Sequence, residues 1–256
     1  MRRIVNLLLF IPLMLSSACS KGSDLVREAR LAEQIEYAIF DGEPVYLETP
    51  DGHRFLSVYT ETDEARGAVI VMHGRGYHPD WADTTNPLRV GLAENGWDTL
   101  SIQMPVLDKQ AKYFDYVPVF AESFPRIETA IQTLRDKGHE RIFLAAHSCS
   151  VHMVNAWVLE GRLDGVAGYI GIGMGATDFR QLMVHEWRLA NMAMPILDIY
   201  GSEDYPAVHR MAPERLAAIE QSDERSRQIV IEGANHDFLD KGDELVEAVS
   251  AWLDAL

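Results

Sequence analysis

Short, continuous apolar runs alternate with helical patterns along most of this chain of 256 residues. The runs predict strands over residues 68–72, 99–102, 142–146, 166–172, 196–200 and 228–231. Between the runs, apolar residues recur at helical spacing, most clearly over residues 125–137 and 151–159. Strands that are apolar on both faces are typical of a parallel sheet with helices on both sides. We therefore predict an α/β fold with a mostly parallel central sheet.

The remaining segments complete this architecture. Residues 44–60 predict a hairpin that turns at Pro50, Asp51 and Gly52, and a helix is expected within residues 206–221. Another helix is expected to start at Asn86, as its cap, with Pro87 in the first position. Apolar residues that stripe the last segment predict a closing helix; they are Leu245, Val246, Val249, Trp252, Leu253 and Leu256.

The chain divides into three predicted regions. Residues 1–18 read as a signal peptide, residues 19–43 as an N-terminal stalk or helix, and residues 44–256 as the folded domain. The second region is charged and helical in pattern, with Leu25, Leu31 and Ile35 spaced for one face. An inserted cap is expected within residues 174–194, where only a small one fits, or none.

The start of the chain has the pattern of an export signal. Arg2 and Arg3 precede an apolar stretch, residues 4–15, that is too short to span a membrane comfortably. Small residues then lead to Cys19, with Ser16 where leucine is usual, and this resembles a bacterial lipoprotein cleavage box. The resemblance implies cleavage before Cys19 and lipid on its sulfur. Cleavage to a soluble periplasmic form and an uncleaved anchor are the alternatives.

If Cys19 carries lipid, the protein belongs to the cell envelope. Ser20, rather than aspartate, follows the cysteine, which by analogy favours the periplasmic face of the outer membrane. The second cysteine, Cys149, is then left without a disulfide partner and is expected to be a buried thiol.

Charge limits the partners of the folded domain. The 39 acidic residues outnumber the 23 basic ones, for a net charge of −16. Nucleic acid and anionic lipid head groups repel such a surface, so neither is an expected partner, and contact with a membrane is expected only through the lipid anchor. We expect a small-molecule substrate and no cofactor.

Ala146, His147, Ser148, Cys149 and Ser150 join the apolar run at residues 142–145 to a helical pattern. A small-x-Ser-x-small pentapeptide between a strand and a helix is typical of a nucleophile elbow, which holds a catalytic serine at the edge of an α/β sheet. The pattern alone is weak, because residues 18–22 of the leader also match it. Its position between strand and helix makes Ser148 a candidate nucleophile.

A nucleophilic serine needs a base and an acid that orients the base. Asp204 follows the strand at 196–200 and is the predicted acid, with Glu203 and Asp198 as alternatives. His236 follows the last strand and is the predicted base. This order, serine then acid then histidine, is that of α/β-hydrolases.

Acyl transfer also needs donors for the oxyanion. The backbone N–H of Cys149 is one predicted donor, and Arg75 or, second, Gly76 supplies the other from the His-Gly loop after the strand at 68–72. His73 of this loop is expected to be structural, and His147 to shape the pocket wall or pack beneath the loop.

Two further groups of residues leave alternatives open. Tyr113, Phe114 and Tyr116 follow a strand end and either bound the acyl pocket or pack in the core or at its rim. A metal site formed by His73, His78 and Asp80 is conceivable, but a loop of mixed polar residues lacks the spacing of metal ligands, so no metal is expected.

Longer segments resemble an uncharacterised bacterial family of α/β-hydrolase-like proteins. The resemblance rests on residues 73–81, 100–107, 147–149 and 197–206 and covers roughly residues 45–256. It implies the α/β-hydrolase fold and no particular substrate. The elbow departs from the common pattern at Ala146 and Ser150, where glycine is usual, although both residues are small enough for a close strand–helix crossing.

The sequence therefore predicts a serine hydrolase, with a carboxylic ester or thioester as substrate and Ser148, Asp204 and His236 as its catalytic triad. An amidase or peptidase with the same triad is the enzymatic alternative, because one triad serves both reactions. The alternative outside enzymology is a non-catalytic envelope lipoprotein that uses the fold as a binding module.

Overall fold

The computed structural model describes residues 22–175, 183 and 185–256. The leader, with the predicted lipid site Cys19, and part of the predicted cap lie outside the described residues. The strands are β1 (Glu43–Glu48), β2 (Arg54–Thr60), β3 (Ala68–Met72), β4 (Asp98–Ile102), β5 (Ile142–His147), β6 (Gly168–Ile172), β7 (Ile196–Gly201) and β8 (Arg227–Ile231).

The helices alternate with these strands from β3 onward, as predicted. The α-helices are α1 (Leu25–Ile35), α2 (Thr85–Glu94), α3 (Tyr113–Tyr116), α4 (Phe124–Asp136), α5 (Cys149–Leu159), α6 (Pro206–Ser222) and α7 (Gly242–Asp254). Short 3-10 helices are η1 (Glu36–Ala38), η2 (Val117–Ser123) and η3 (Leu189–Asn191). The sequence did not predict α3 and the three short helices, which have too few turns to show a periodic pattern.

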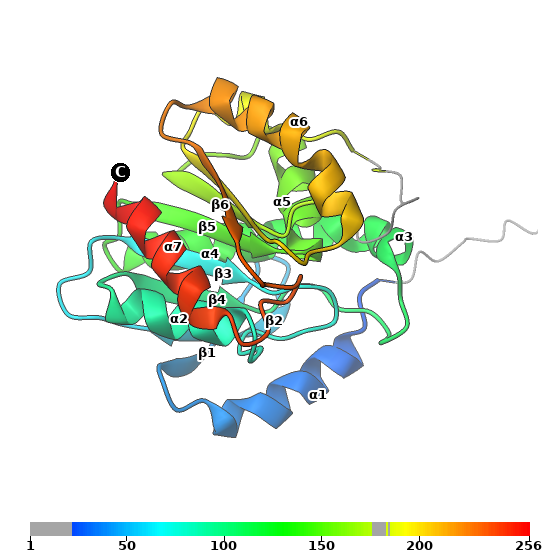
Figure 1. Cartoon of the computed structure of the whole chain (residues 1–256). Helices are drawn as coiled ribbons and strands as arrows, with labels where there is room; N and C mark the ends of the chain where they lie inside the picture. Colours follow the sequence, from blue (N-terminus) through cyan, green and yellow to red (C-terminus); the bar gives the residue numbers. More distant parts are fainter. Residues whose placement is uncertain (1–21, 176–182, 184) are drawn as a thin grey trace, which may run out of the picture.

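The eight strands form one sheet in the order β1-β2-β4-β3-β5-β6-β7-β8 (Figure 1). Strand β2 pairs antiparallel with β1 and β4, and all pairs from β4 to β8 are parallel. The predicted hairpin and the mostly parallel sheet are thus confirmed. Because the parallel strands end together, with Met72 level with Ile102 and Ala146, the loops that follow them meet at one edge.

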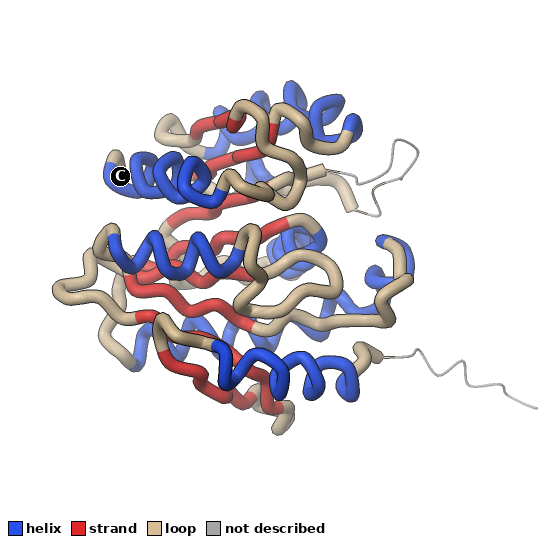
Figure 2. The backbone as a smooth tube through the Cα atoms, turned by 60° about the horizontal axis from the view of Figure 1, so that its bottom comes forward, coloured by secondary structure: helices blue, strands red, loops and turns tan. Residues whose placement is uncertain are grey.

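Helices cover both faces of the sheet, as Figures 1 and 2 show. On one face, α2 and α7 pack over the sheet around Leu88, Leu92 and Leu245. On the other, α4 and α5 bury Ile127 and Met153 in a second apolar cluster. With both faces covered, the strands between them are buried, and only the strand ends and their loops are open to a substrate.

Helix α1 packs on the domain through a face that matches the predicted one only in part, because Ile35 is buried as expected and Leu25 is not. Leu25 is 51% exposed, and Glu28 is buried with Ala32 and Ile35. Glu28 accepts two hydrogen bonds of 3.0 Å from the guanidinium of Arg126 in α4. The sequence predicted the helix correctly. It did not predict that Glu28 is buried, because an apolar stripe contains no carboxylate and the partner, Arg126, lies far away in the chain.

Helix α2 starts earlier than predicted. Its N-cap position is Thr84, and Asn86 lies inside the first turn. The Asn86 amide instead donates to Asp80 at 2.7 Å, and the Thr84 hydroxyl donates to the carbonyl oxygen of Asp237 at 2.8 Å. Asn86, the residue predicted to cap the helix, is therefore engaged by Asp80 instead.

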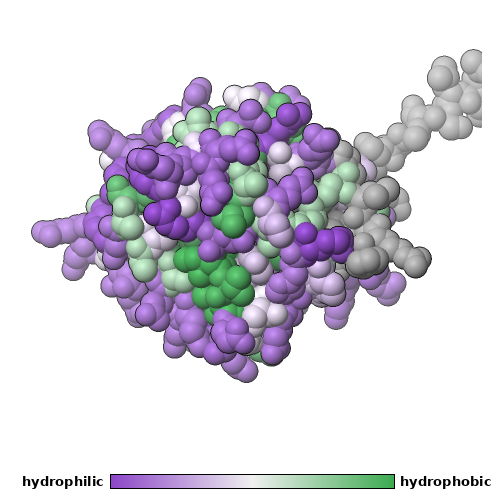
Figure 3. Space-filling view, turned by 45° about the horizontal axis from the view of Figure 1, so that its top comes forward, coloured by the Kyte–Doolittle hydropathy of each residue, from purple (hydrophilic) through white to green (hydrophobic). Residues whose placement is uncertain are grey.

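The surface is largely hydrophilic on the face shown in Figure 3, with hydrophobic residues gathered near the centre of the view and in smaller areas around it. Within the described ranges, no helix has the length and apolar character needed to cross a membrane.

Candidate active site

Ser148 lies in the turn between β5 and α5, with φ 55° and ψ −114°. A positive φ is uncommon and costly for a non-glycine residue, and the nucleophile elbow is a turn in which it recurs. The backbone N–H of Ser148 donates to Ile172 of the neighbouring strand at 3.0 Å, which holds the turn against the sheet. The predicted elbow is thus present, with the serine at the carboxyl edge.

The structure brings the three predicted catalytic residues into one hydrogen-bonded row. Nε2 of His236 lies 2.8 Å from Oγ of Ser148, and Nδ1 lies 2.7 Å from Oδ1 of Asp204. Asp204 and His236 are both buried. Since a carboxylate can only accept, Nδ1 carries the proton and Nε2 is free to accept the proton of the Ser148 hydroxyl.

The two alternative acids lie in other settings. Asp198 is fully buried within β7, where it accepts a 2.9 Å hydrogen bond from Nε of Arg215 in α6. Glu203 is exposed, and its backbone N–H donates to the carbonyl oxygen of Ala234. Of the three candidates, Asp204 is the one hydrogen-bonded to His236.

Gly173 leaves the room that His236 occupies. Its φ is +63°, and a Cβ atom there would lie 2.9 Å from Cε1 of His236 and 3.3 Å from Oδ2 of Asp204. Both conditions favour glycine, because an L-residue is strained at this φ and a side chain would push on the imidazole. The sequence did not single out this glycine.

The loop after β3 passes beside the elbow. Gly74 approaches His147 so closely that a Cβ would meet its Nδ1 at 2.9 Å, and Gly76 has φ +76°. Arg75, between the two glycines, lines a pocket together with Ser148 and Cys149. The predicted oxyanion donors therefore lie on two segments that meet at the candidate nucleophile.

Ser150, the departure from the common elbow pattern, joins these two segments. Its hydroxyl donates a 2.6 Å hydrogen bond to the carbonyl oxygen of His73, at the start of the loop. Glycine at this position has no hydroxyl to make that bond. The serine thus fixes the helix that carries the elbow to the loop that carries Arg75.

His73 has the geometry of a structural residue. Its Nε2 accepts from the backbone N–H of Met104 at 2.9 Å, which leaves Nδ1 to donate to the carbonyl of Gly74 at 2.7 Å. Burial lowers the pKa of His73 to about 3, so the ring is neutral at physiological pH. It thereby ties the start of the loop to the backbone that follows β4.

His147, the neighbour of the candidate nucleophile, contacts the candidate base. Its Nε2 lies 2.9 Å from the carbonyl oxygen of His236 and donates to it. Burial, followed by the nearby His236, lowers the pKa of His147 to about 4. The neutral ring thus helps to hold the backbone that positions His236.

His152 lies one helical turn beyond Ser148 and lines the same pocket, together with Tyr113. Its ring meets Tyr113 edge-on at 4.7 Å and stacks on Trp187 at 5.3 Å, and burial lowers its pKa to about 4. The sequence reading passed over His152, although its i+4 spacing from Ser148 on a helix was a usable signal.

The three aromatic residues of α3 lie in different settings. Tyr113 lines the pocket, Phe114 is 55% exposed, and Tyr116 is buried with its hydroxyl accepting from the backbone of Leu107 at 3.0 Å. Only the first of the three therefore bounds the pocket beside Ser148.

The conceivable metal ligands do not converge. Asp80 forms an ion pair with Arg89 at 2.6 Å, and His73 is engaged by the backbone as described above. Among the described residues, no three histidine, cysteine, aspartate or glutamate side chains are grouped so that they could hold a metal ion.

The first part of the chain, residues 27–121, matches a family described as "Protein of unknown function (DUF3530)". The match begins in α1 and includes the loop with Arg75, whereas Ser148, Asp204 and His236 lie beyond it. No curated protein matches the chain.

Solved structures with similar folds cover most of the chain. An esterase from Pyrococcus furiosus has a TM-score of 0.65 at 14% identity over 88% of this chain and 93% of that one. An alpha-beta serine hydrolase homologue from Coxiella burnetii has a TM-score of 0.60 at 17% identity, covering 83% and 98%. A dienelactone hydrolase from Anabaena variabilis has a TM-score of 0.62 at 18% identity, covering 84% and 97%.

These similarities and the strand order establish the α/β-hydrolase fold. Together with the family match, they support the resemblance to an uncharacterised α/β-hydrolase-like family. At this level of identity, similarity to solved structures defines the fold and leaves the reaction to be argued from the residues.

Proposed function

We propose that this protein is a serine hydrolase that cleaves a carboxylic ester or thioester through an acyl-enzyme. The observation that carries the proposal is the unbroken hydrogen-bonded row from Asp204 through His236 to Ser148, with Ser148 on a strained strand-to-helix turn. A hydroxyl is a weak nucleophile until a positioned base accepts its proton, and this row supplies the base and its orienting acid.

In the proposed reaction, Oγ of Ser148 attacks the acyl carbon while its proton passes to Nε2 of His236. Asp204 accepts the Nδ1 hydrogen bond and stabilises the imidazolium that forms. The backbone N–H of Cys149, at the start of α5, and that of Arg75 or Gly76 donate to the oxyanion. His236 then protonates the leaving alkoxide or thiolate, and the acyl-enzyme remains.

Water completes the cycle. His236 takes a proton from the water molecule that attacks the acyl carbon, and the second tetrahedral intermediate releases Ser148 and the free acid. An amide would follow the same steps with an amine as the leaving group, so an amidase remains the alternative within this mechanism.

A fluorophosphonate probe tests the proposal, because it phosphonylates an activated serine without requiring the natural substrate. We expect labelling of the wild-type protein and of Cys149→Ala, and none of Ser148→Ala. The Cys149 thiol is a suitable control because burial raises its pKa to about 12, which keeps it unreactive. Folded wild-type protein that takes no label would overturn the hydrolase proposal in favour of a binding module.

A panel of esters, thioesters and amides then defines the bond that is cleaved. We expect turnover of esters or thioesters, and faster turnover of amides than of matched esters would point to an amidase.

We also propose that the protein is a lipoprotein of the cell envelope, attached through Cys19. The proposal rests on the sequence alone, because this cysteine lies outside the described residues. Incorporation of labelled palmitate should be lost in Cys19→Ala, and label that persists in this variant would refute attachment at that residue.

A further inference from the structure

The Arg75 side chain lines the pocket beside Ser148 and is half-buried. Within the part of the chain that the structure describes, its guanidinium has no hydrogen bond and no ion pair. Three other arginines with buried side chains are matched with carboxylates: Arg89 with Asp80, Arg126 with Glu28 and Arg215 with Asp198. Among the described residues, Arg75 thus differs from these three in having no acidic partner.

The charge of Arg75 acts on one residue that lines the pocket and on two tyrosines outside its lining. Burial raises the pKa of the Cys149 thiol to about 12, and Arg75 acts in the opposite direction. Burial also raises the pKa of Tyr116 to about 12 against the opposing effects of Arg27 and Arg75. Across the site, burial and Asp237 raise the pKa of Tyr205, and Arg75 again opposes the shift.

The carboxylates nearest to the reacting atoms are already engaged. Asp204 accepts from His236 and from the backbone of Tyr205, and Asp237 accepts a 2.9 Å hydrogen bond from the hydroxyl of Tyr77. In a chain with a net charge of −16, a cation that is unpaired among the described residues and lies beside the candidate nucleophile is suited to bind an external anion.

The position of the pocket indicates which half of the substrate carries the anion. The pocket is lined by Cys149, His152 and Tyr113, whereas His236 is not among its lining residues. Since His236 has to reach the leaving group in order to protonate it, the leaving group lies on the His236 side. The acyl group then lies on the opposite side of Ser148, toward Arg75.

We propose that the substrate is an ester or thioester of a dicarboxylic acid, and that Arg75 binds its free carboxylate. The inference rests on the proposed hydrolase function. The planar guanidinium presents paired donors that match a carboxylate, and such charge-assisted bonds are stronger than neutral ones. Bound in this way, the carboxylate places the second carboxyl carbon, the one that carries the ester, near Ser148.

Two substrates that differ only in charge test this role. Monomethyl glutarate carries the carboxylate, and methyl 5-amino-5-oxopentanoate replaces it with an amide of nearly the same shape. We expect kcat/KM of the wild-type enzyme to be about tenfold or more higher for the acid. In Arg75→Gln this ratio should fall to about one, and Arg75→Lys should keep part of it because charge remains without the planar fork.

Arg54→Gln is the matched control. It removes one positive charge from an exposed position on β2 and should leave the acid-to-amide ratio unchanged. Equal turnover of the acid and the amide by the wild type, or a ratio that Arg75→Gln does not change, would overturn the proposal. Thermal melting of each variant verifies that it is folded.

A binding measurement separates this inference from the proposed function. Calorimetry on Ser148→Ala should detect monomethyl glutarate and lose it when Arg75→Gln is added. If the wild-type protein hydrolyses neutral esters but Ser148→Ala does not bind the acid, only the dicarboxylate inference fails. If no ester is cleaved and no fluorophosphonate binds covalently, the hydrolase function fails, while binding of the acid still tests Arg75.

Discussion

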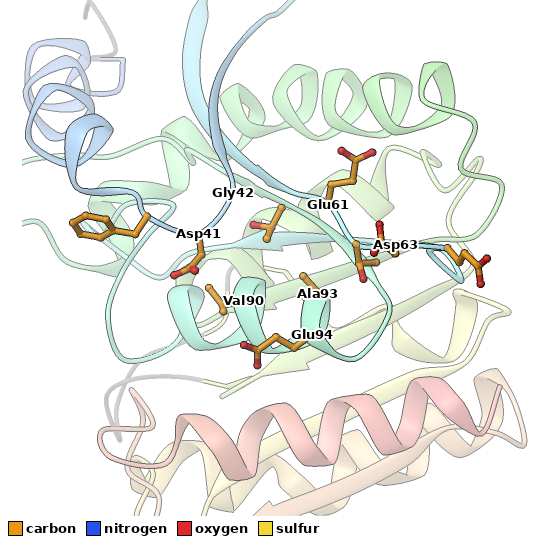
Figure 4. A pocket seen from close by; sticks show the side chains of 11 residues that line it. Asp41, Gly42, Glu61, Asp63, Val90, Ala93 and Glu94 are labelled. Atoms are coloured by element: carbon orange, nitrogen blue, oxygen red, sulfur yellow. The ribbon is translucent and has the colours of Figure 1, made fainter.

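The two ends of the parallel strands carry polar residues in very different surroundings. At the carboxyl end, Ser148, His236 and Asp204 are tied into a row of hydrogen bonds beside a pocket of only about 10 Å³ among the described residues. At the amino end, Asp41 and Glu94 border an open hollow of about 810 Å³ (Figure 4).

The comparison teaches that the size of a hollow does not identify the chemistry. The larger hollow is lined by exposed acidic side chains, including Glu61 and Asp63, that water can solvate. Beside the smaller pocket lie the strained backbone of Ser148, the buried carboxylate of Asp204 and the imidazole of His236, whose proton position is fixed. Strain and a buried charge each cost free energy of folding, and both are concentrated at functional sites. We therefore expect substitutions at the carboxyl end to reduce activity strongly and substitutions at the amino end to leave it unchanged.

Asp204→Asn should have the largest effect. An amide in place of the carboxylate favours the wrong tautomer of His236, and kcat is expected to fall by about 10³- to 10⁴-fold, the size seen when a triad acid is changed in this way. Steady-state kinetics with an ester found active in the panel measures the loss. Asp63→Asn, the same substitution at the amino end, should keep full activity, and a comparable loss in both variants would break the contrast between the two ends.

Gly173→Ala should have the next largest effect. A methyl group 2.9 Å from Cε1 of His236 has to displace the ring, and a shift on the order of 1 Å at a catalytic group costs about 10²-fold in rate. Gly52→Ala is the matched control, because Gly52 has φ +86° but nothing within 4 Å of an added Cβ.

Both glycine variants should lose stability from the left-handed backbone, by about 1–2 kcal/mol, and only Gly173→Ala should lose activity. Urea unfolding and ester kinetics on the same preparations separate the two effects. If the two variants lost activity equally, backbone strain rather than contact with His236 would explain the loss in Gly173→Ala.

Much of the carboxyl end could be predicted from the sequence. The elbow, Asp204 and His236 follow strands whose apolar pattern is strong, and parallel strands bring their carboxyl ends together. Gly173 was not singled out, because its role depends on contacts with His236 and Asp204, which lie far away in the chain. His152 was missed although its spacing from Ser148 was a usable signal. The predicted face of α1 was right for Ile35 and wrong for Leu25, and the burial of Glu28 depends on Arg126, which is distant in the chain.

Acid should destabilise the protein through the carboxyl end. Burial lowers the pKa of His73 to about 3 and those of His147 and His152 to about 4, against about 6.5 in an unfolded chain. Well above pH 6.5, these three histidines are neutral in both the folded and the unfolded state. As the pH falls from 6.5 toward 4, the unfolded state binds protons that the folded state refuses, so the free energy of unfolding decreases.

Each such histidine contributes a slope of up to about 1.4 kcal/mol per pH unit in this window. Urea unfolding at several pH values between 7 and 5 measures the total. His152→Gln should lower the slope of the free energy of unfolding against pH by the contribution of about one proton, whereas Glu94→Gln at the amino end should leave the slope unchanged. A slope that His152→Gln leaves unchanged would show that His152 is not the group taking up the proton on unfolding.

Glu94→Gln itself should have the smallest effect on activity and stability. Glu94 is exposed at the end of α2, beside the other acids of the hollow, and neutralising it removes only solvent-screened repulsion. We expect a free energy of unfolding within about 0.5 kcal/mol of wild type and unchanged ester kinetics. A clear loss of activity would place a functional contact at the amino end, which the exposed setting of its carboxylates argues against.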